Sequence, residues 1–487
     1  AHFYRVVWSV IVTSAILGAL YTGWHVWNNY VTSGPVTVVE TTYFKYAQVS
    51  FPSVVICDVS RVDWKRVLAL DYAKMVSTDQ RVDMDQVRQT IQALLQGLSV
   101  ITYGDFDEFN RLRQFENSTI PLLNKVNITQ LLLQVMRPCP EVFIGECYWR
   151  YERLNCCDIF ELQKTEFGFC FSYNSDFSEV SMGPSQLGET GLDSFWEDSR
   201  GVWRPKRTST RGQFSGLRVR VSTPPLEELP PLVDARPGVK VLIGEPRAFT
   251  FGTDMIVSSG SFGDINVWGD RVYSRPRLRS MTLDRRKCLF MDEARALGRK
   301  YYLRQNCKVE CYEMYVRQFC NCTLEFMFPY SGYPECTIEQ LLCLNKHNLA
   351  FNQIMPSNVD RIFFISNDSS TEILTCDCDL DCDHQMYIAE VTVAETSNST
   401  KEVLLDIHFR RSTCNLYRSD ITYGWLDLLV SFGGTAGLFV GASLLSGVEI
   451  VYFLTLRLYH FWRGQRNKIR DETPRVFYIK DFISPRI

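Results

Sequence analysis

The chain has 487 residues, a net charge of −3, 17 cysteines and 22% charged residues. It is too long for one small domain and too polar overall for a transporter with many membrane spans. Its even charge balance argues against a nucleic-acid partner.

A first membrane span is predicted near the start of the chain. Residues 6–24, VVWSVIVTSAILGALYTGW, carry no charge, and we place the span at residues 5–27 after a cytoplasmic segment at residues 1–4. A cleaved signal peptide is the alternative. The apolar run is longer than a typical signal core, and no small-residue cleavage site closes it, which favours a retained span.

The long middle part predicts an α+β domain. FPSVVICD (51–58) predicts a buried strand, residues 61–135 amphipathic helices, and residues 212–244 strands with proline-rich turns. Residues 282–320 predict helix again. KEVLLDIHFRRSTC (401–414) predicts a strand that leads back into a second span. We therefore expect an α+β membrane protein with a domain at residues 28–426 between two spans.

Cysteines and sequons place this domain outside the cell. Sixteen of the 17 cysteines lie between residues 57 and 382, and disulfides persist in oxidising compartments. We expect glycans at four N-x-S/T sequons, whereas Asn321, between two cysteines, is a poorer candidate. The four are Asn117, Asn127, Asn367 and Asn398.

Ten cysteines crowd residues 288–382. Two of them, four residues apart, share one face of a predicted helix. If the returning chain runs antiparallel to that helix, the bonds nest in reverse order, and the remaining four cysteines could nest likewise. The expected pairs are Cys311–Cys376, Cys307–Cys378, Cys288–Cys382, Cys320–Cys343 and Cys322–Cys336. A zinc site in CDCDLDCDH (376–384) is the alternative, but an extracellular location favours disulfides, and we expect no metal or cofactor.

A second uncharged stretch, LLVSFGGTAGLFVGASLLSGV (428–448), is about 31 Å long as a helix and predicts a second span at residues 427–456. Gly433, Gly437 and Gly441 recur every four residues, as in helix packing within membranes. Gly441-Ala442-Ser443 weakens the helix and predicts irregular backbone that lines a wet cavity. Basic residues after this span place both termini in the cytoplasm, with a tail at residues 457–487. They are Arg457, Arg463, Arg466, Lys468 and Arg470.

Several segments, in matching order over essentially the whole chain, resemble the epithelial sodium channel/degenerin family. They are FPSVVICD, GFCFSYNS (168–175), the ten-cysteine block, CDCDLDCDHQMY and GLFVGASLLSGVE. The longer stretch GLFVGASLLSGVEIVYFLTLRLYHFW is most similar to the arthropod pickpocket branch. The resemblance implies a trimeric, amiloride-sensitive Na⁺ channel of the plasma membrane, opened by an extracellular ligand or a mechanical stimulus. Its partners would be Na⁺, membrane lipids and two further subunits, identical or related.

The family's subunits have a palm, knuckle, β-ball, finger and thumb. The resemblance places the finger at residues 61–167 and the thumb at residues 280–382. The palm strands would lie at residues 44–60, 168–182, 214–245 and 401–415.

The resemblance also implies roles for single residues. Gly441, Ala442 and Ser443 would form the selectivity filter. The gate region would contain Val430, Ser431, Gly433 and Gly434, with Gly437 left to helix packing and Glu449 at the inner mouth. Cys57 would pair with Cys170, and two further bonds, in an order not assigned, would join Cys139, Cys147, Cys156 and Cys157. Cys414 would remain a buried free thiol.

Two departures from the family pattern modify these expectations. Acid-sensing relatives carry thumb aspartates at the positions of Asn345 and Leu349, so we expect that protons are not the main opening stimulus. The family's cytoplasmic His-Gly pair is absent before the first span, so we expect the chain to be a trimmed segment.

No catalytic signature such as GxSxG or HExxH occurs, so no enzyme is expected. The alternatives to this channel are an ATP-gated trimeric channel and a non-conducting receptor.

Overall fold

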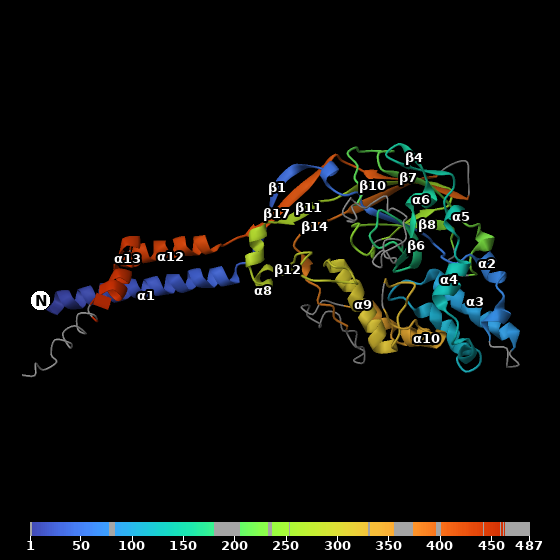
Figure 1. The fold of residues 1–487 in the computed structure, drawn as a ribbon, viewed down its shortest axis with the longest axis horizontal. Coiled ribbons are helices and arrows are strands. Elements are labelled where there is room, and N and C mark those ends of the chain that lie inside the picture. The colour runs from blue at the N-terminus through green and yellow to red at the C-terminus, as the bar shows by residue number, and fades with distance from the viewer. Residues whose placement is uncertain are drawn as a thin grey trace, which may run out of the picture. The chain divides into compact units, whose positions relative to one another are not determined.

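The computed structural model describes residues 2–76, 83–179, 205–231, 236–252, 254–329, 332–354, 374–395, 401–441, 443–457, 459–460 and 462. The chain divides into two compact units (Figure 1). One unit contains both ends of the chain, residues 1–36 and 421–487, and the other contains residues 37–420. Asn367 and Asn398 lie outside the described residues, as does Ala442.

The described residues of the unit with the chain ends are mostly helical. Helix α1 (His2–Thr32) is followed, at the other end of the chain, by α12 (Trp425–Val440), α13 (Leu444–Tyr452) and a π-helical turn (Phe453–Arg457). Within the described residues, α1 is the one continuous helix that is long and apolar enough to cross a membrane. The helices on either side of residue 442 are bent by 86° and make a second candidate span if they are counted together.

The larger unit is built on a five-stranded sheet with β2 (Ser53–Asp58) at its centre. Five of the six residues of β2 are buried, because strands flank it on both sides and side chains cover both faces. The strand predicted from FPSVVICD is therefore present. The other strands are β5 (Glu161–Thr165), β6 (Gly168–Tyr173), β8 (Gly238–Gly244) and β9 (Asp254–Ser258).

A six-stranded sheet has the order β15-β10-β16-β7-β3-β4. Strand β10 pairs in parallel with β16 and antiparallel with β15. Every second residue of β10 is buried, the pattern of a strand with one face in the core. The bounds are β3 (Glu146–Trp149), β4 (Glu152–Asn155), β7 (Leu217–Ser222), β10 (Ser261–Trp268), β15 (Ile388–Glu395) and β16 (Glu402–Phe409).

The strand predicted at residues 401–414 is in fact two strands. The chain turns after β16 and continues as β17 (Thr413–Ile421), which belongs to a different sheet of order β1-β17-β11-β14. The turn occurs because β16 hydrogen-bonds with β7 and β10, while β17 hydrogen-bonds with β11. The expectation that KEVLLDIHF runs directly into the predicted second span is therefore wrong, since β17 is the strand that precedes α12. The other strands are β1 (Pro35–Lys45), β11 (Arg271–Ser274) and β14 (His384–Gln385).

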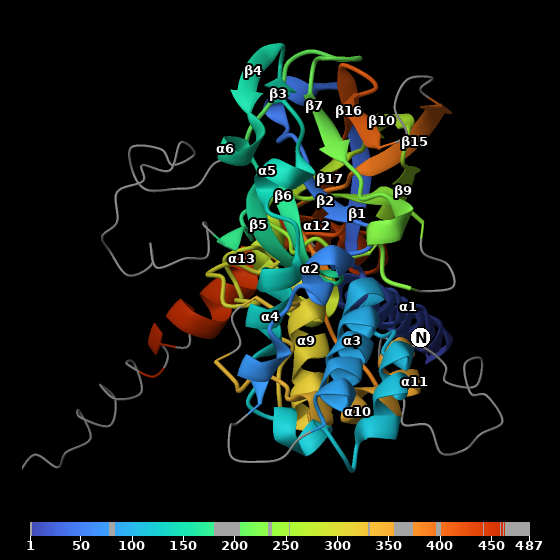
Figure 2. The ribbon, with the colours of Figure 1, turned by 90° about the vertical axis from the view of Figure 1, so that its right-hand side faces the viewer.

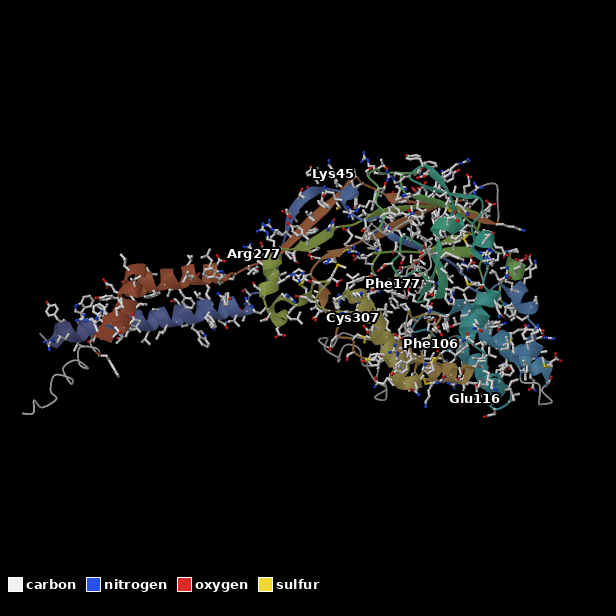
Figure 3. The ribbon with its side chains drawn as sticks, viewed as in Figure 1. Lys45, Phe106, Glu116, Phe177, Arg277 and Cys307 are labelled. Atoms are coloured by element: carbon white, nitrogen blue, oxygen red, sulfur yellow. A yellow bond between two sulfur atoms is a disulfide. The ribbon has the colours of Figure 1, made fainter. Side chains whose placement is uncertain are left out.

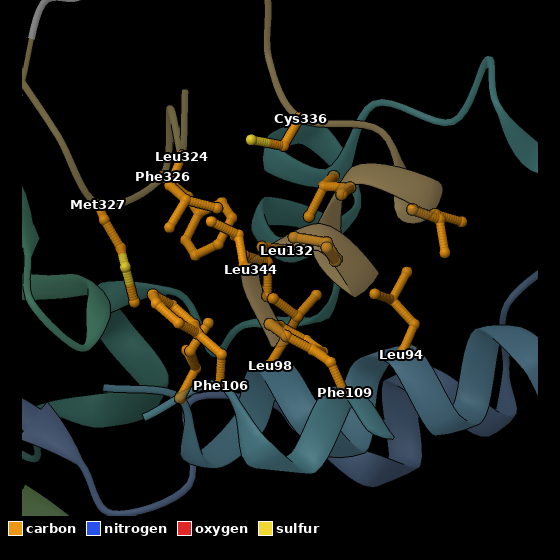
Figure 4. Packing of buried hydrophobic residues seen from close by; sticks show 14 of the residues in the cluster. Leu94, Leu98, Phe106, Phe109, Leu132, Leu324, Phe326, Met327, Cys336 and Leu344 are labelled. Carbon is orange, nitrogen blue, oxygen red and sulfur yellow. The ribbon is translucent and has the colours of Figure 1, made fainter. Parts of the chain in front are cut away.

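Helices α3, α9 and α10 group together, away from the six-stranded sheet (Figure 2). Their buried side chains form one cluster with those of α4, and Figure 4 shows Leu94 and Leu98 of α3 facing Phe109 and Leu344. The helices are α2 (Trp64–Leu68), α3 (Met84–Val100), α4 (Ile128–Val135), α5 (Cys139–Val142), α6 (Cys156–Ile159), α8 (Leu283–Arg286), α9 (Arg304–Cys320), α10 (Ile338–Lys346) and α11 (Asn348–Asn352).

The helix expected over residues 282–320 is interrupted. Only α8 and α9 are helical there, with a short strand β12 (Cys288–Leu289), paired with β13 (Leu380–Asp381), between them. Lys287, with a φ of 50°, is the left-handed residue that ends α8. Leu297, with a φ of 54°, lies in the irregular segment between the two helices. The helical spacing of apolar residues does not reveal these breaks.

Eight disulfides link the described residues of the larger unit, and Cys414 is a buried free thiol. Around α9 the structure has the nested order that the spacing predicts; Figure 3 labels Cys307, which pairs with Cys378. Because the three cysteines of CDCDLDC are all in disulfides, none is a free thiolate for zinc. The pairs are Cys57–Cys170, Cys139–Cys157, Cys147–Cys156, Cys288–Cys382, Cys307–Cys378, Cys311–Cys376, Cys320–Cys343 and Cys322–Cys336.

Candidate pore and selectivity filter

Helices α1 and α12 pack through glycines of α1 and phenylalanines of α12. A Cβ atom on Gly18 would lie 2.7 Å from the ring of Phe439, and one on Gly23 would lie 3.4 Å from Phe432. Glycine therefore allows the close approach, as small residues do between membrane helices. Neither glycine was predicted from the sequence to pack against α12. The available signal was the pair of phenylalanines seven residues apart, a spacing that places them on one helix face.

Substitution of Gly18 by leucine is expected to separate α1 from α12. A leucine side chain would overlap the ring of Phe439, and overpacking of this kind costs about 1–3 kcal/mol. We expect a lower melting temperature of the purified protein and less of it at the cell surface. Gly23→Ala is the matched control and should have a smaller effect, because its added methyl group is at 3.4 Å. Equal effects of the two variants would contradict this packing.

The glycines of α12 lie on the face that does not contact α1. At about 100° per residue, Phe439 lies about 20° from Phe432 around the helix. Gly437 and Val430 lie about 140° and about 160° from Phe432, on the opposite side. Added Cβ atoms on Gly433 and Gly434 would meet no atom within 4 Å. Val430 is 67% exposed, and Gly437 is exposed as well. This glycine face of α12 is therefore uncovered in the single chain.

The helix breaks at the tripeptide Gly441-Ala442-Ser443. Gly441 ends α12 in the left-handed conformation, with φ 67°, and its N–H donates to the carbonyl of Gly437 at 3.1 Å. Ser443 begins α13, and its hydroxyl accepts from the N–H of Ser446 at 3.3 Å. A left-handed residue strongly favours glycine because it has no Cβ. The irregular backbone expected here from the sequence is therefore present on both sides of residue 442.

The start of α12 is held by side-chain hydrogen bonds. The N–H of Gly424 donates to the carboxylate of Asp427 at 2.9 Å, which caps the helix. The hydroxyls of Tyr423 and Ser431 are hydrogen-bonded, so one residue of the expected gate region is fixed to a residue two positions before the helix. Tyr423 was not singled out from the sequence. Glu449, on α13, is exposed.

Asn345 has polar partners from the segment before α4. Its side-chain amide donates to the carbonyl of Phe106 at 3.1 Å, and its oxygen accepts from Arg113 at 3.1 Å. An aspartate here would place a carboxylate oxygen against the carbonyl of Phe106. Leu349 is 53% exposed.

A family described as "Amiloride-sensitive sodium channel" matches residues 1–453. The chain belongs to this family. Pickpocket protein 19 of Drosophila melanogaster is 24% identical over 96% of this chain and 89% of its own length. Sodium channel protein Nach of Drosophila ananassae is 25% identical over 69% of this chain, which spans 60% of that protein. Acid-sensing ion channel 4 of Mus musculus is 22% identical over 64% of this chain and 55% of its own length.

The family resemblance expected from the sequence is thereby confirmed. The amiloride-sensitive sodium channel family consists of cation channels of the plasma membrane, not of enzymes. A solved structure, "Cryo-EM structure of a proton-activated chloride channel", aligns over 92% of this chain and 97% of that chain, with 6% identity and a TM-score of 0.30. That likeness is too weak to support an argument.

Proposed function

We propose that three subunits, either three copies of this chain or this chain with related ones, form an amiloride-sensitive Na⁺ channel. The filter would be the ring of Gly441, Ala442 and Ser443. The observation that carries this proposal is the left-handed end of α12 at Gly441. The last carbonyl groups of a helix lack intrahelical partners and carry partial negative charge, so they favour a cation. Carbonyl and hydroxyl oxygens at this break can replace part of the ion's hydration shell.

The gate would lie at Val430–Gly434, on or beside the glycine face of α12. Packing of small residues on neighbouring subunits would bring three such faces together. The position of the bulky Val430 side chains would then set the width of the ion path. Gly437 would pack between subunits, and Glu449 would attract cations at the inner mouth. The uncovered state of Gly433 and Gly434 in one chain supports this arrangement.

The outer domain would transmit the stimulus through two strands. Strand β1 follows α1, β17 precedes α12, and the two are neighbours in one sheet. The hydroxyls of Thr37 and Ser419 are 2.8 Å apart and join them. We propose that the disulfide-bonded helices around α9 form the thumb and move as one body, and that Asn117 and Asn127, both exposed, carry glycans.

The direct test is to express the full-length protein and record current while pH, force and candidate ligands are varied. A Na⁺ current blocked by amiloride supports the proposal. A protein that reaches the surface and carries no current under any of these conditions would be a non-conducting receptor. Activation by ATP with amiloride resistance would favour the ATP-gated alternative.

Acidification is expected to open the channel weakly at most. Asn345 does not titrate, and its neutral amide already has acceptors, so protonation at this position cannot change a thumb contact. The measurement is the current at pH 5 relative to that with another effective stimulus. A dominant low-pH current that vanishes when Asn345 or Leu349 is substituted would contradict this expectation.

A further inference from the structure

Asn321 ends helix α9 and is the first residue of the sequon Asn321-Cys322-Thr323. Its φ and ψ are 52° and 34°, a left-handed conformation that asparagine adopts more readily than most residues with a Cβ. Its backbone N–H donates to the carbonyl of Arg317 at 2.8 Å. Because the helix end uses only this backbone group, the side-chain amide of Asn321 is left for another role.

The side-chain amide of Asn321 is accessible. Asn321 is exposed, whereas the three residues that follow it are buried. Within the part of the chain that the structure describes, this amide has no hydrogen-bond partner. The hydroxyl of Thr323, by contrast, is fully buried and donates to Glu313 at 3.1 Å. A sugar on Asn321 would therefore extend into solvent without breaking a contact of the domain.

The two disulfides beside Asn321 close only after the sequon has been made. Cys320 pairs with Cys343 and Cys322 with Cys336, at separations of 23 and 14 residues. At about 5–20 residues per second, the nearer partner is synthesised about 0.7–3 s after Cys322. Disulfide formation then takes seconds to hours, so the sequon is still unconstrained when it enters an oxidising compartment. The two neighbouring cysteines, which made Asn321 a poorer candidate from the sequence, therefore do not exclude modification.

We propose that Asn321 is a further glycosylation site and carries an N-linked oligosaccharide in the mature protein. Asn-x-Thr is the acceptor sequence for this modification. Nδ2 of Asn321 forms a bond to the anomeric carbon of N-acetylglucosamine, and the bond from that carbon to the pyrophosphate of the lipid-linked donor breaks. The lipid pyrophosphate leaves with the electron pair, and the amide loses one proton. This proposal requires that the domain is outside the cell, but not that the channel conducts ions.

Mass spectrometry of the full-length protein, purified from eukaryotic cells, tests the proposal on the unaltered chain. Peptide-N-glycosidase releases the sugar and converts a modified asparagine to aspartate, which takes up heavy oxygen from labelled water. We expect this label at Asn321, and Asn117 in the same sample reports whether the domain met the transferase. An unlabelled Asn321 beside a labelled Asn117 would overturn the proposal and leave the outer location intact. Absence of the label from both would also count against that location.

A gel assay on variants provides the second measurement. Asn321→Gly removes the acceptor and suits the left-handed helix end, so it should fold and lose one step of the ladder that partial deglycosylation produces. Thr323→Ser is the matched control and should keep that step, because serine retains both the sequon and a hydroxyl for Glu313. A ladder that is unchanged in Asn321→Gly would contradict the proposal.

Discussion

The double variant Gly441→Ala, Ser443→Ala is expected to lose most of the channel's discrimination between Na⁺ and K⁺. At φ 67°, alanine at position 441 costs about 1–2 kcal/mol, so the backbone at the break must rearrange. Loss of the Ser443 hydroxyl removes the cap of α13, worth about 0.5–2 kcal/mol. A loss of about 1.4 kcal/mol in differential ion stabilisation lowers the Na⁺/K⁺ permeability ratio about tenfold. The measurement is the reversal potential with Na⁺ on one side and K⁺ on the other.

Gly447→Ala is the matched control for this variant. An added Cβ atom on Gly447 would meet no atom within 4 Å, and the residue lies within the helical span of α13. We expect normal selectivity from it at a similar surface level. Unchanged selectivity in the double variant would remove Gly441–Ser443 from the filter.

Removal of the disulfide Cys57–Cys170 is expected to have the largest effect on stability. The bond joins neighbouring strands β2 and β6 and closes a separation of 113 residues. In the chain-entropy account, closing a loop of this length contributes about 4.8 kcal/mol, an upper value because other disulfides already constrain the unfolded chain. Both sulfurs are buried, so Cys57→Ala, Cys170→Ala also leaves a cavity. We expect a large fall in melting temperature.

The pair Cys147–Cys156 provides the comparison. Its separation is only nine residues, for which the same account gives about 2.6 kcal/mol. Cys147→Ala, Cys156→Ala should therefore lower the melting temperature by less. If the two double variants melt at the same temperature, loop closure is not what Cys57–Cys170 contributes.

Local patterns in the sequence predicted those features that depend on neighbouring residues. FPSVVICD has the run of β-branched residues that a buried central strand requires, and β2 has this position. The four-residue spacing of Cys307 and Cys311 fixed their common helix face, and the nested pairing followed from one assumption about chain direction.

Features that depend on distant partners were not predictable in this way. The change of sheet between β16 and β17 is one example. It could not be predicted from nearby residues, because the strands with which they pair, β10 and β11, lie more than 100 residues earlier in the chain. Strand β10 was missed for the same reason, although SFGDINVW alternates as a half-buried strand does.

In the candidate pore, too, features with a local signal were predicted and contacts between distant residues were not. Gly441 and Ser443 were identified from three small residues in a row, a local signal. The contact between Gly18 and Phe439 joins residues at opposite ends of the chain, and nothing near Gly18 distinguishes it from an ordinary glycine in an apolar helix.

Single-channel recording of the purified full-length protein in a planar bilayer tests the central claim most directly. With Na⁺ as the permeant cation we expect unitary currents that amiloride blocks and that reverse near the Na⁺ equilibrium potential. Unitary currents that reverse at the Cl⁻ equilibrium potential, or no unitary currents under any stimulus, would contradict a Na⁺ filter at the break after α12.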